Sequence, residues 1–310
     1  MTRWQRTLTA PSAPRLTDIS DLAIGLIDIE LSMPPTGRAN DTAVLLLCPE
    51  QRPPAAVLKL ARGPLGAAEL RMQRRVLAEL LVHQGLDEQW RALLPRILAF
   101  DERPNGTVSV ESYRPGMDLA EVLARRPNRV EELTAAALSA IAPLHRRTAT
   151  FVVGDVSLSR RWVVEVLAGL THVCRRLDPR RVPEVDRLGA LLRQALVRRP
   201  IPMSWTHGEY TPGNVQVAGE QGPVTAIVDW GGARPGQPAL IDEYLMILTA
   251  SCQVERADLG AVVAERLRAG GLSDSERNAL RPARDRSDAD ISDRERIGKR
   301  VDERVAILLT

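Results

Sequence analysis

The chain has 310 residues, of which 44% are hydrophobic and 26% are charged, and its formal net charge is +3. This much apolar material excludes a chain that is disordered as its main state. No window of about 18 residues is free of charge, which excludes a membrane span, and the length predicts two lobes because it exceeds what one compact core usually holds.

Partners and compartment follow from composition and charge pattern. Acidic residues are intermixed with the basic ones and only 3% of the residues are aromatic, so we expect no nucleic-acid partner. Residues 1–18 lack a continuous apolar stretch and a small-residue cleavage site, so we expect a cytoplasmic protein with no membrane partner. Cys48, Cys174 and Cys252 lie far apart, which favours buried free thiols over a disulfide framework or a zinc ribbon. The oligomeric state stays open.

The first half of the chain reads as a small antiparallel sheet with one helix. Short apolar or β-branched runs, separated by turn-rich pieces, predict strands over Ile24 to Leu31, Thr42 to Cys48, Ala55 to Leu60, Ile97 to Phe100 and Val108 to Tyr113. From Ala67 to Gln84 the apolar residues recur about every 3.6 residues, which predicts a helix.

The second half is mainly helical. Amphipathic patterns predict helices over Asp118 to Arg125, Arg129 to Arg147, Arg160 to Leu177, Val185 to Val197, Ala239 to Cys252 and Leu259 to Ala269. Two short apolar runs, Val215 to Ala218 and Val224 to Val228, flank a Gly-rich turn and predict a hairpin. We therefore expect an α+β fold with a small lobe at residues 1–113, a connector at 114–118 and a larger, mainly helical lobe at 119–310.

The last part of the chain allows two interpretations. Residues 273–304 are dense in mixed charge and poor in large apolar side chains, which is typical of a mobile excursion. The apolar residues Ile291, Ile297, Val301, Val305 and Leu308 nevertheless keep a helical spacing. Because the last residues are apolar, we predict a final helix that packs on the second lobe.

Lysine is scarce in this chain. Of the 42 basic residues 40 are Arg and two are Lys, at positions 59 and 299. Lys59 stands in the strand-like run Ala55 to Leu60, whereas Lys299 stands in a charged, helix-like stretch. A compact ammonium and a planar guanidinium are not interchangeable where a point charge meets a phosphate. One interpretation is that Lys59 stands where Arg does not serve; the other is that two lysines remain in an Arg-rich chain by accident.

A carboxylate, an amide and a second carboxylate follow one another with informative spacing. Asn214 lies five residues after Glu209, and Asp229 follows the second strand of the predicted hairpin. This is the order that kinases use for a base that accepts the hydroxyl proton and for two magnesium ligands. Carboxylate and amide oxygens suit magnesium, a hard cation. The constellation predicts phosphoryl transfer, in which positioning and charge neutralisation supply most of the rate.

These residues also carry a family resemblance. His207-Gly208-Glu209 with Asn214, followed by Ile227-Val228-Asp229-Trp230, resembles the HGD-x-x-x-x-N and I-D-W motifs of the aminoglycoside phosphotransferase and choline kinase-like family. Further matching segments are Gly37-Arg38-Ala39-Asn40, Val57-Leu58-Lys59, Glu111 to Gly116, Leu144-His145-Arg146, and Gly236-Gln237-Pro238 with Asp242. The resemblance thus extends over most of the chain.

The resemblance implies a bilobal protein-kinase-like fold, ATP or GTP with Mg²⁺, and transfer of the γ-phosphoryl group to a small-molecule hydroxyl. The acceptor would be an aminoglycoside-like antibiotic, a sugar, an amino alcohol or a nucleoside. Glu209 would be the catalytic base, with His207 orienting the catalytic turn, and Asn214 and Asp229 would hold the metal. The nucleotide would be bound in the lobe at 1–113 by Gly37, Asn40, Lys59, Glu69, Ser112 and Tyr113.

The sequence departs from the family pattern at four places. Glu209 stands where Asp is usual, and a displacement of about 1 Å in a reacting group can cost about 100-fold in rate. On the helix, Glu69 is the natural acidic partner for Lys59, but the family's frame places Gln73 there. The predicted nucleotide loop has a single glycine, Gly37. The spacing from Gly236 to Asp242 is one residue longer than expected.

Two functions other than phosphoryl transfer match part of this motif. A nucleotide-binding pseudoenzyme or regulatory module would explain the change at Glu209 as lost chemistry. The presence of Lys59, Asn214 and Asp229 favours an active enzyme, since a decayed site would tend to lose those residues too. His207-Gly208-Glu209 also matches the H-x-E of zinc deaminases, but the sequence lacks the P-C-x-x-C that such a site requires.

Overall fold

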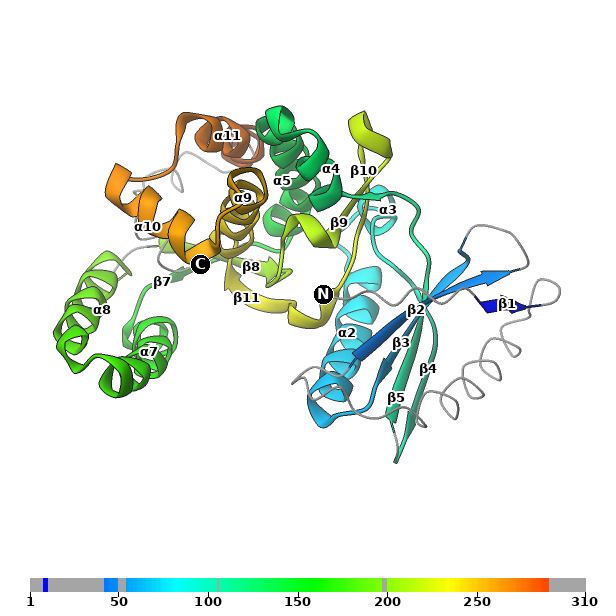
Figure 1. Cartoon of the computed structure of the whole chain (residues 1–310), viewed down its shortest axis with the longest axis horizontal. Coiled ribbons are helices and arrows are strands. Elements are labelled where there is room, and N and C mark those ends of the chain that lie inside the picture. The colour runs from blue at the N-terminus through cyan, green and yellow to red at the C-terminus, as the bar shows by residue number, and fades with distance from the viewer. Residues whose placement is uncertain (1–7, 11–41, 50–53, 105, 197–199, 290–310) are drawn as a thin grey trace. The chain divides into compact units, whose positions relative to one another are not determined.

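The computed structural model describes residues 8–10, 42–49, 54–104, 106–196 and 200–289 (Figure 1). The chain divides into two compact units. The first unit is Met1–Leu119 with Gly213–Ala233, and the second unit is Ala120–Pro212 with Arg234–Thr310. The sequence placed its boundary at 114–118 and kept the hairpin in the second lobe, whereas this division groups the hairpin with the first unit. The α+β class is confirmed.

A five-stranded sheet organises the first unit. Its strands are β1 (Leu8–Ala10), β2 (Thr42–Pro49), β3 (Ala56–Ala61), β4 (Ile97–Arg103) and β5 (Gly106–Ser112), in the order β1-β2-β3-β5-β4. The pairs β2–β3, β3–β5 and β5–β4 are antiparallel, and β1 pairs with β2 in parallel. Four predicted strands are confirmed with ends shifted by a few residues. The strand predicted over Ile24 to Leu31 lies outside the described residues.

The two faces of this sheet differ in chemistry. Strand alternation places one set of apolar side chains on one face, where they form a buried cluster: Leu45, Leu47, Ala56, Leu58, Leu60, Val108 and Val110. The register pairs Lys59 with Ser109, so these residues and Glu111, two positions along β5, share the opposite face. All three are buried. A polar and charged set is therefore enclosed on the second face.

Helix α2 (Pro64–Val82) packs against the strands that carry this polar set (Figure 1). Gly63 precedes it in an extended conformation and Pro64 occupies its first turn, where a missing N–H costs nothing. The helix therefore begins three residues before the predicted Ala67. At Gly66 a β-carbon would stand 2.6 Å from Oγ1 of Thr42, so the absence of a side chain there allows the close approach of helix and sheet.

A short helix and a second sheet complete the first unit. Helix α3 (Glu88–Arg91) is capped by Asp87, whose side chain accepts a hydrogen bond from the N–H of Trp90. Strands β6 (Met117–Asp118), β9 (Val215–Val217) and β10 (Val224–Ile227) form an antiparallel sheet in the order β10-β9-β6. The predicted hairpin is thus confirmed as β9 and β10. The 3-10 turns η4 (Pro212–Asn214), η5 (Gly219–Gln221) and η6 (Trp230–Gly232) flank or join its strands.

The second unit is mainly helical, as predicted. Its helices are α4 (Leu119–Arg125, beginning at the unit boundary), α5 (Val130–Arg147), α6 (Val156–Ser159), α7 (Glu165–Leu177), α8 (Val182–Leu196), α9 (Leu240–Glu255), α10 (Leu259–Ala269) and α11 (Asp274–Ala289), with the turns η1 (Pro127–Arg129), η2 (Arg160–Val164) and η3 (Pro179–Arg181). The helix predicted over Arg160 to Leu177 begins as the π-helical turn η2 and continues as α7. None of the helices in the described part of the chain is long and apolar enough to cross a membrane.

The sequence missed a three-stranded sheet in the second unit. Strands β7 (Thr150–Val153), β8 (Pro200–Thr206) and β11 (Arg234–Pro238) pair antiparallel in the order β11-β8-β7. Two of these strands contain proline, which lacks the donor that a ladder needs and so weakens any strand signal. No strand was predicted from the sequence at these residues. Strand β8 leads directly into His207.

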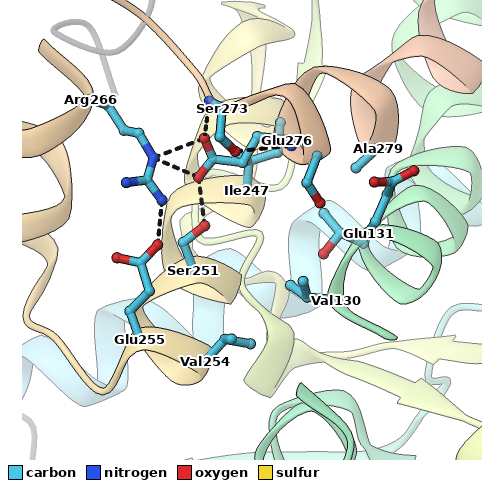
Figure 2. Close-up of a pocket in the computed structure, with 12 residues that line it drawn as sticks. Val130, Glu131, Ile247, Ser251, Val254, Glu255, Arg266, Ser273, Glu276 and Ala279 are labelled. Carbon is cyan, nitrogen blue, oxygen red and sulfur yellow. Dashed lines mark hydrogen bonds and ion pairs between the residues drawn. The ribbon is translucent and has the colours of Figure 1, made fainter. Parts of the chain in front are cut away.

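The charge-dense stretch that begins at residue 273 is helical where the structure describes it. Helix α11 packs against α5 and is tied to its neighbours by a buried ion-pair network (Figure 2). Figure 2 shows Arg266 of α10 between the carboxylates of Glu255 and Glu276, with Ser251 and Ser273 also reaching Glu276. The carboxylate of Glu276 in this stretch thus serves helix packing. The final helix predicted beyond residue 290 lies outside the described residues.

Candidate active site

Lys59 lies at the centre of a polar cluster in the first unit. Its Nζ donates hydrogen bonds to Oε1 of Gln73 and Oδ1 of Asp229, both at 3.0 Å, and lies 3.4 Å from Oε1 of Glu111. The Nε2 amide of Gln73 donates in turn to Oε1 of Glu111 at 2.8 Å. The lysine strand, helix α2, strand β5 and the end of the hairpin therefore meet at one ammonium group.

The protonation of this cluster follows from its composition. Burial lowers the pKa of Lys59, but the charges of Glu111 and Asp229 and the hydrogen bonds to them outweigh that effect, so its pKa is raised. Burial raises the pKa of Glu111 more than Lys59 lowers it. A single cation serves two anions, and Lys59 stays charged.

Asp229 follows β10 in a strained backbone conformation. Its φ of 71° and ψ of 56° lie in the left-handed region, which costs a residue with a β-carbon roughly 1–2 kcal/mol. Val215 pairs with Ile227, and the N–H of Val228 donates to the carbonyl of Asn214 at 2.9 Å. The hairpin pairing therefore brings Asn214 and Asp229 to the same end of the ladder.

The donor set at this end of the hairpin fits magnesium. A carboxylate and an amide supply oxygen ligands, and magnesium is commonly held by one or two protein oxygens together with phosphates and water. The Asp229 side chain is 45% exposed, which leaves its carboxylate accessible to a cation. Among the described residues no group of three or more His, Cys, Asp and Glu is placed to hold a metal ion.

In the second unit, Asp242 organises the loop that carries the predicted base. Its fully buried carboxylate accepts hydrogen bonds from the N–H groups of His207, at 2.7 Å, and Gly208, at 2.9 Å. The ring Nε2 of His145 lies 2.9 Å from the same carboxylate. Gly208 has a φ of 81°, which glycine adopts at no steric cost. This network fixes the backbone immediately before Glu209.

Glu209 is exposed, whereas the residues on either side of it are anchored. The ring Nδ1 of His207 accepts a hydrogen bond from the N–H of Glu209 at 3.3 Å. The buried hydroxyl of Tyr210 donates to the carbonyl of Ala137 at 2.6 Å, and burial raises the pKa of that hydroxyl well above its ordinary value. The loop therefore holds a rigid backbone and presents the carboxylate of Glu209 to solvent.

Gly37, Asn40, Ser112 and Tyr113 were predicted to bind the nucleotide together with Lys59 and Glu69. Gly37 and Asn40 lie outside the described residues. The N–H of Ser112 donates to the carbonyl of Arg96, and the N–H of Tyr113 donates to the carbonyl of Ala55, so both donors are used within the sheet.

Glu69 lies on α2 against the segment that follows Asp229. A β-carbon added to Gly231 would stand 2.6 Å from Cγ of Glu69. Gln73, one turn further along α2, is the helix residue that hydrogen-bonds Lys59. The frame that places Gln73 opposite the lysine therefore matches the observed contact.

Sequence reasoning gave no role to Glu111. The residue belonged to a matched motif, but only the following Ser112 and Tyr113 were assigned to the nucleotide. A signal was present, because Val108-Ser109-Val110-Glu111 alternates apolar and polar residues, the pattern of a strand with one polar face. The sequence alone did not show that this face is buried beneath a helix.

The comparison with protein families identifies the class. The chain belongs to the phosphotransferase enzyme family, whose model matches residues 34–293. It is thus a small-molecule phosphotransferase, as the resemblance of its motifs implied.

Two solved structures illustrate what the chain is similar to. The aminoglycoside phosphotransferase APH(3'')-Id from Streptomyces rimosus is 18% identical, with 93% of this chain and 97% of that chain covered and a TM-score of 0.47. A choline/ethanolamine kinase family protein from Mesorhizobium loti is 17% identical, with 93% and 98% covered and a TM-score of 0.45. No curated protein sequence matches the chain significantly.

Proposed function

We propose that the protein transfers the γ-phosphoryl group of ATP, or of GTP, to a hydroxyl group of a small molecule in the presence of Mg²⁺. The observation that carries this proposal is the 3.0 Å contact between Nζ of Lys59 and Oδ1 of Asp229. The contact unites the two motifs, 170 residues apart, that the chemistry requires in one place. Family membership supports the reaction class.

Each residue has a role that its chemistry allows. Lys59 would neutralise charge on the nucleotide phosphates, and Asn214 and Asp229 would hold Mg²⁺. The bound ion would neutralise charge on the phosphate oxygens. The acceptor oxygen attacks the γ-phosphorus, the bond from that phosphorus to the bridging oxygen of the nucleoside diphosphate breaks, and the hydroxyl proton passes to Glu209.

The remaining candidate residues would position the loop that carries Glu209 or contact the nucleotide. We assign His207 to positioning, because its ring is fully buried and hydrogen-bonds the backbone of Glu209. Glu69 is assigned to the nucleotide site through its place on α2, and Gly37 and Asn40 through their motif alone. Ser112 and Tyr113 would meet the base through groups other than their N–H donors, which the sheet already uses.

A coupled assay tests the proposal directly. Production of ADP or GDP is followed for a panel of aminoglycosides, sugars, amino alcohols and nucleosides, and the phosphorylated product is confirmed by mass spectrometry. We expect one acceptor class to respond and Glu209→Ala to lower kcat by about 100-fold or more, the usual contribution of a positioned base. The proposal fails if no acceptor is phosphorylated and Glu209→Ala changes nothing.

A second function is favoured by one observation, the glutamate at position 209. Its carboxylate stands one methylene further from the backbone than the aspartate of the family motif. If that displacement removes transfer, the protein is a nucleotide-binding pseudoenzyme or regulatory module. Magnesium-dependent ATP binding would then persist in calorimetry while the acceptor panel stays silent, and Glu209→Asp would create activity.

A further inference from the structure

We propose that the buried carboxylate of Glu111 on β5, joined to Lys59 by the amide of Gln73, is the anion that positions Lys59 for the nucleotide. In this arrangement the strand supplies the charge and helix α2 supplies only an amide. Glu111 is thus a positioning residue that acts through Lys59. The inference rests on the proposed role of Lys59 in nucleotide binding.

Three side chains from three elements form a closed triangle. Nζ of Lys59 lies 3.0 Å from Oε1 of Gln73, Nε2 of Gln73 lies 2.8 Å from Oε1 of Glu111, and the lysine and glutamate atoms are 3.4 Å apart. Lys59, Gln73 and Glu111 are 9%, 1% and 3% exposed. A buried charge is tolerated when it is paired and hydrogen-bonded, and this triangle meets both conditions.

Glu111 can hold Lys59 while magnesium is bound at Asp229, when the Asp229 carboxylate is no longer available to the lysine. The side chain of Asp229 is 45% exposed and that of Glu111 only 4%. Asp229 is also the proposed metal ligand, so a lysine held by Asp229 alone would compete with magnesium for one carboxylate. Glu111 offers Lys59 an anion on the buried side of the cluster. The ammonium then keeps its place when the metal occupies Asp229.

The amide at position 73 is the side chain that suits a carboxylate at position 111. An amide presents an acceptor oxygen to Lys59 and donor hydrogens to Glu111 at the same time. A carboxylate at position 73 would instead place two negative charges about 3 Å apart, where one of them takes up a proton. A carboxylate at position 73 should therefore preserve Mg²⁺-ATP binding only if position 111 carries the amide.

A double-mutant cycle tests this exchange. The full-length chain is compared with Glu111→Gln, Gln73→Glu and the double variant, and the dissociation constant of Mg²⁺-ATP is measured by calorimetry without any acceptor. We expect each single variant to bind about 10-fold more weakly or worse, the effect of losing a hydrogen bond to a charged group. The double variant should return to within about 3-fold of the wild type, since the pair is coupled. Lys59→Ala shows the complete loss of binding, and Asp101→Asn, at an exposed position of β4, is the neutral control.

The outcomes separate this inference from the proposed function. If the wild type binds Mg²⁺-ATP but transfers no phosphoryl group, the proposed function is contradicted, and the double-mutant cycle still tests the role of Glu111. Glu111→Gln that binds like the wild type, or a double variant no better than the weaker single variant, overturns the inference. Absence of any Mg²⁺-ATP binding by the wild type overturns both.

Thermal unfolding shows whether each variant folds. If a single variant does not fold, the double variant decides. A folded double variant that binds within about 3-fold of the wild type supports the coupling, and one that is unfolded or weak contradicts it.

Discussion

Nζ of Lys59 lies 3.0 Å from Oδ1 of Asp229, although 170 residues separate them in the chain. Lys59 is a buried residue within strand β3, and Asp229 follows β10 in a left-handed conformation. A nearly buried ammonium thus faces a half-exposed carboxylate. This contact joins the charge that would meet phosphates to the ligand that would meet the metal.

The first prediction exchanges the lysine for the other common cation. Lys59→Arg should lower kcat/KM for ATP by about 10-fold or more, because a planar guanidinium cannot make the contacts of a compact ammonium in this buried triangle. Lys299→Arg is the matched control, since it makes the same change at the chain's other lysine. Steady-state kinetics with saturating acceptor measure both. Equal activity of Lys59→Arg and the wild type would contradict a role for this lysine in nucleotide binding.

The second prediction concerns the base. In an active enzyme the pocket is adapted to the longer side chain of Glu209, so Glu209→Asp should lower kcat by about 10- to 100-fold, the effect of a misplacement near 1 Å. KM for ATP should change little, because Lys59, Asn214 and Asp229 are untouched. The kcat of this variant against the preferred acceptor decides the matter. A higher kcat in Glu209→Asp would favour the pseudoenzyme interpretation.

The third prediction removes the carboxylate of Asp242, the clamp that holds the backbone of the loop carrying Glu209. In the wild type the Asp242 carboxylate accepts hydrogen bonds from the N–H groups of His207 and Gly208. Asp242→Asn places amide hydrogens against these donors, so it should lower the free energy of unfolding by roughly 2–3 kcal/mol. It should also lower kcat by about 10-fold or more through displacement of Glu209. Denaturant unfolding and kinetics measure the two effects.

Glu243→Gln serves as the control for Asp242→Asn. It removes a carboxylate from the same first turn of α9 and should cost less than about 1 kcal/mol. A destabilised Asp242→Asn variant with unchanged kcat would show that the clamp serves stability alone.

The sequence predicted the local elements of secondary structure well because their signals are local. The period of α2, the alternation of β3 and the turn between β9 and β10 each lie within a few neighbouring residues. The hairpin also sufficed to bring Asn214 beside Asp229, since antiparallel pairing dictates which residues meet.

Pairings between distant elements could not be derived in this way. The role of Glu111 depends on which face of β5 lies beneath α2, and the choice between Glu69 and Gln73 depends on the rotation of that helix about its axis. Strand β8 was not predicted because its prolines weaken the strand pattern and because its partners β7 and β11 lie far away in the sequence. These features are set by packing, which a single sequence does not display.

The fourth prediction concerns the ion-pair network of α9, α10 and α11. Glu276→Gln leaves the buried guanidinium of Arg266 without its main partner and should lower the free energy of unfolding by about 3 kcal/mol. Asp101→Asn removes an exposed carboxylate paired with Arg103 and should cost under about 0.5 kcal/mol. Urea unfolding of both variants gives the comparison. Equal stability of the two would show that the network is neutral.

The pH dependence of that network supplies the last prediction. Burial raises the pKa of Glu276, but hydrogen bonds from Arg266, Ser251 and the Ser273 backbone lower it further, so the net pKa lies below the ordinary 4.5. A carboxyl whose pKa is depressed in the folded state stabilises the protein fully above its unfolded pKa and loses that contribution as the pH falls through the folded pKa. The stability difference between wild type and Glu276→Gln should therefore be constant near neutrality and shrink below about pH 4.5. Urea titrations at a series of pH values measure it, and a difference that grew on acidification would contradict the assignment.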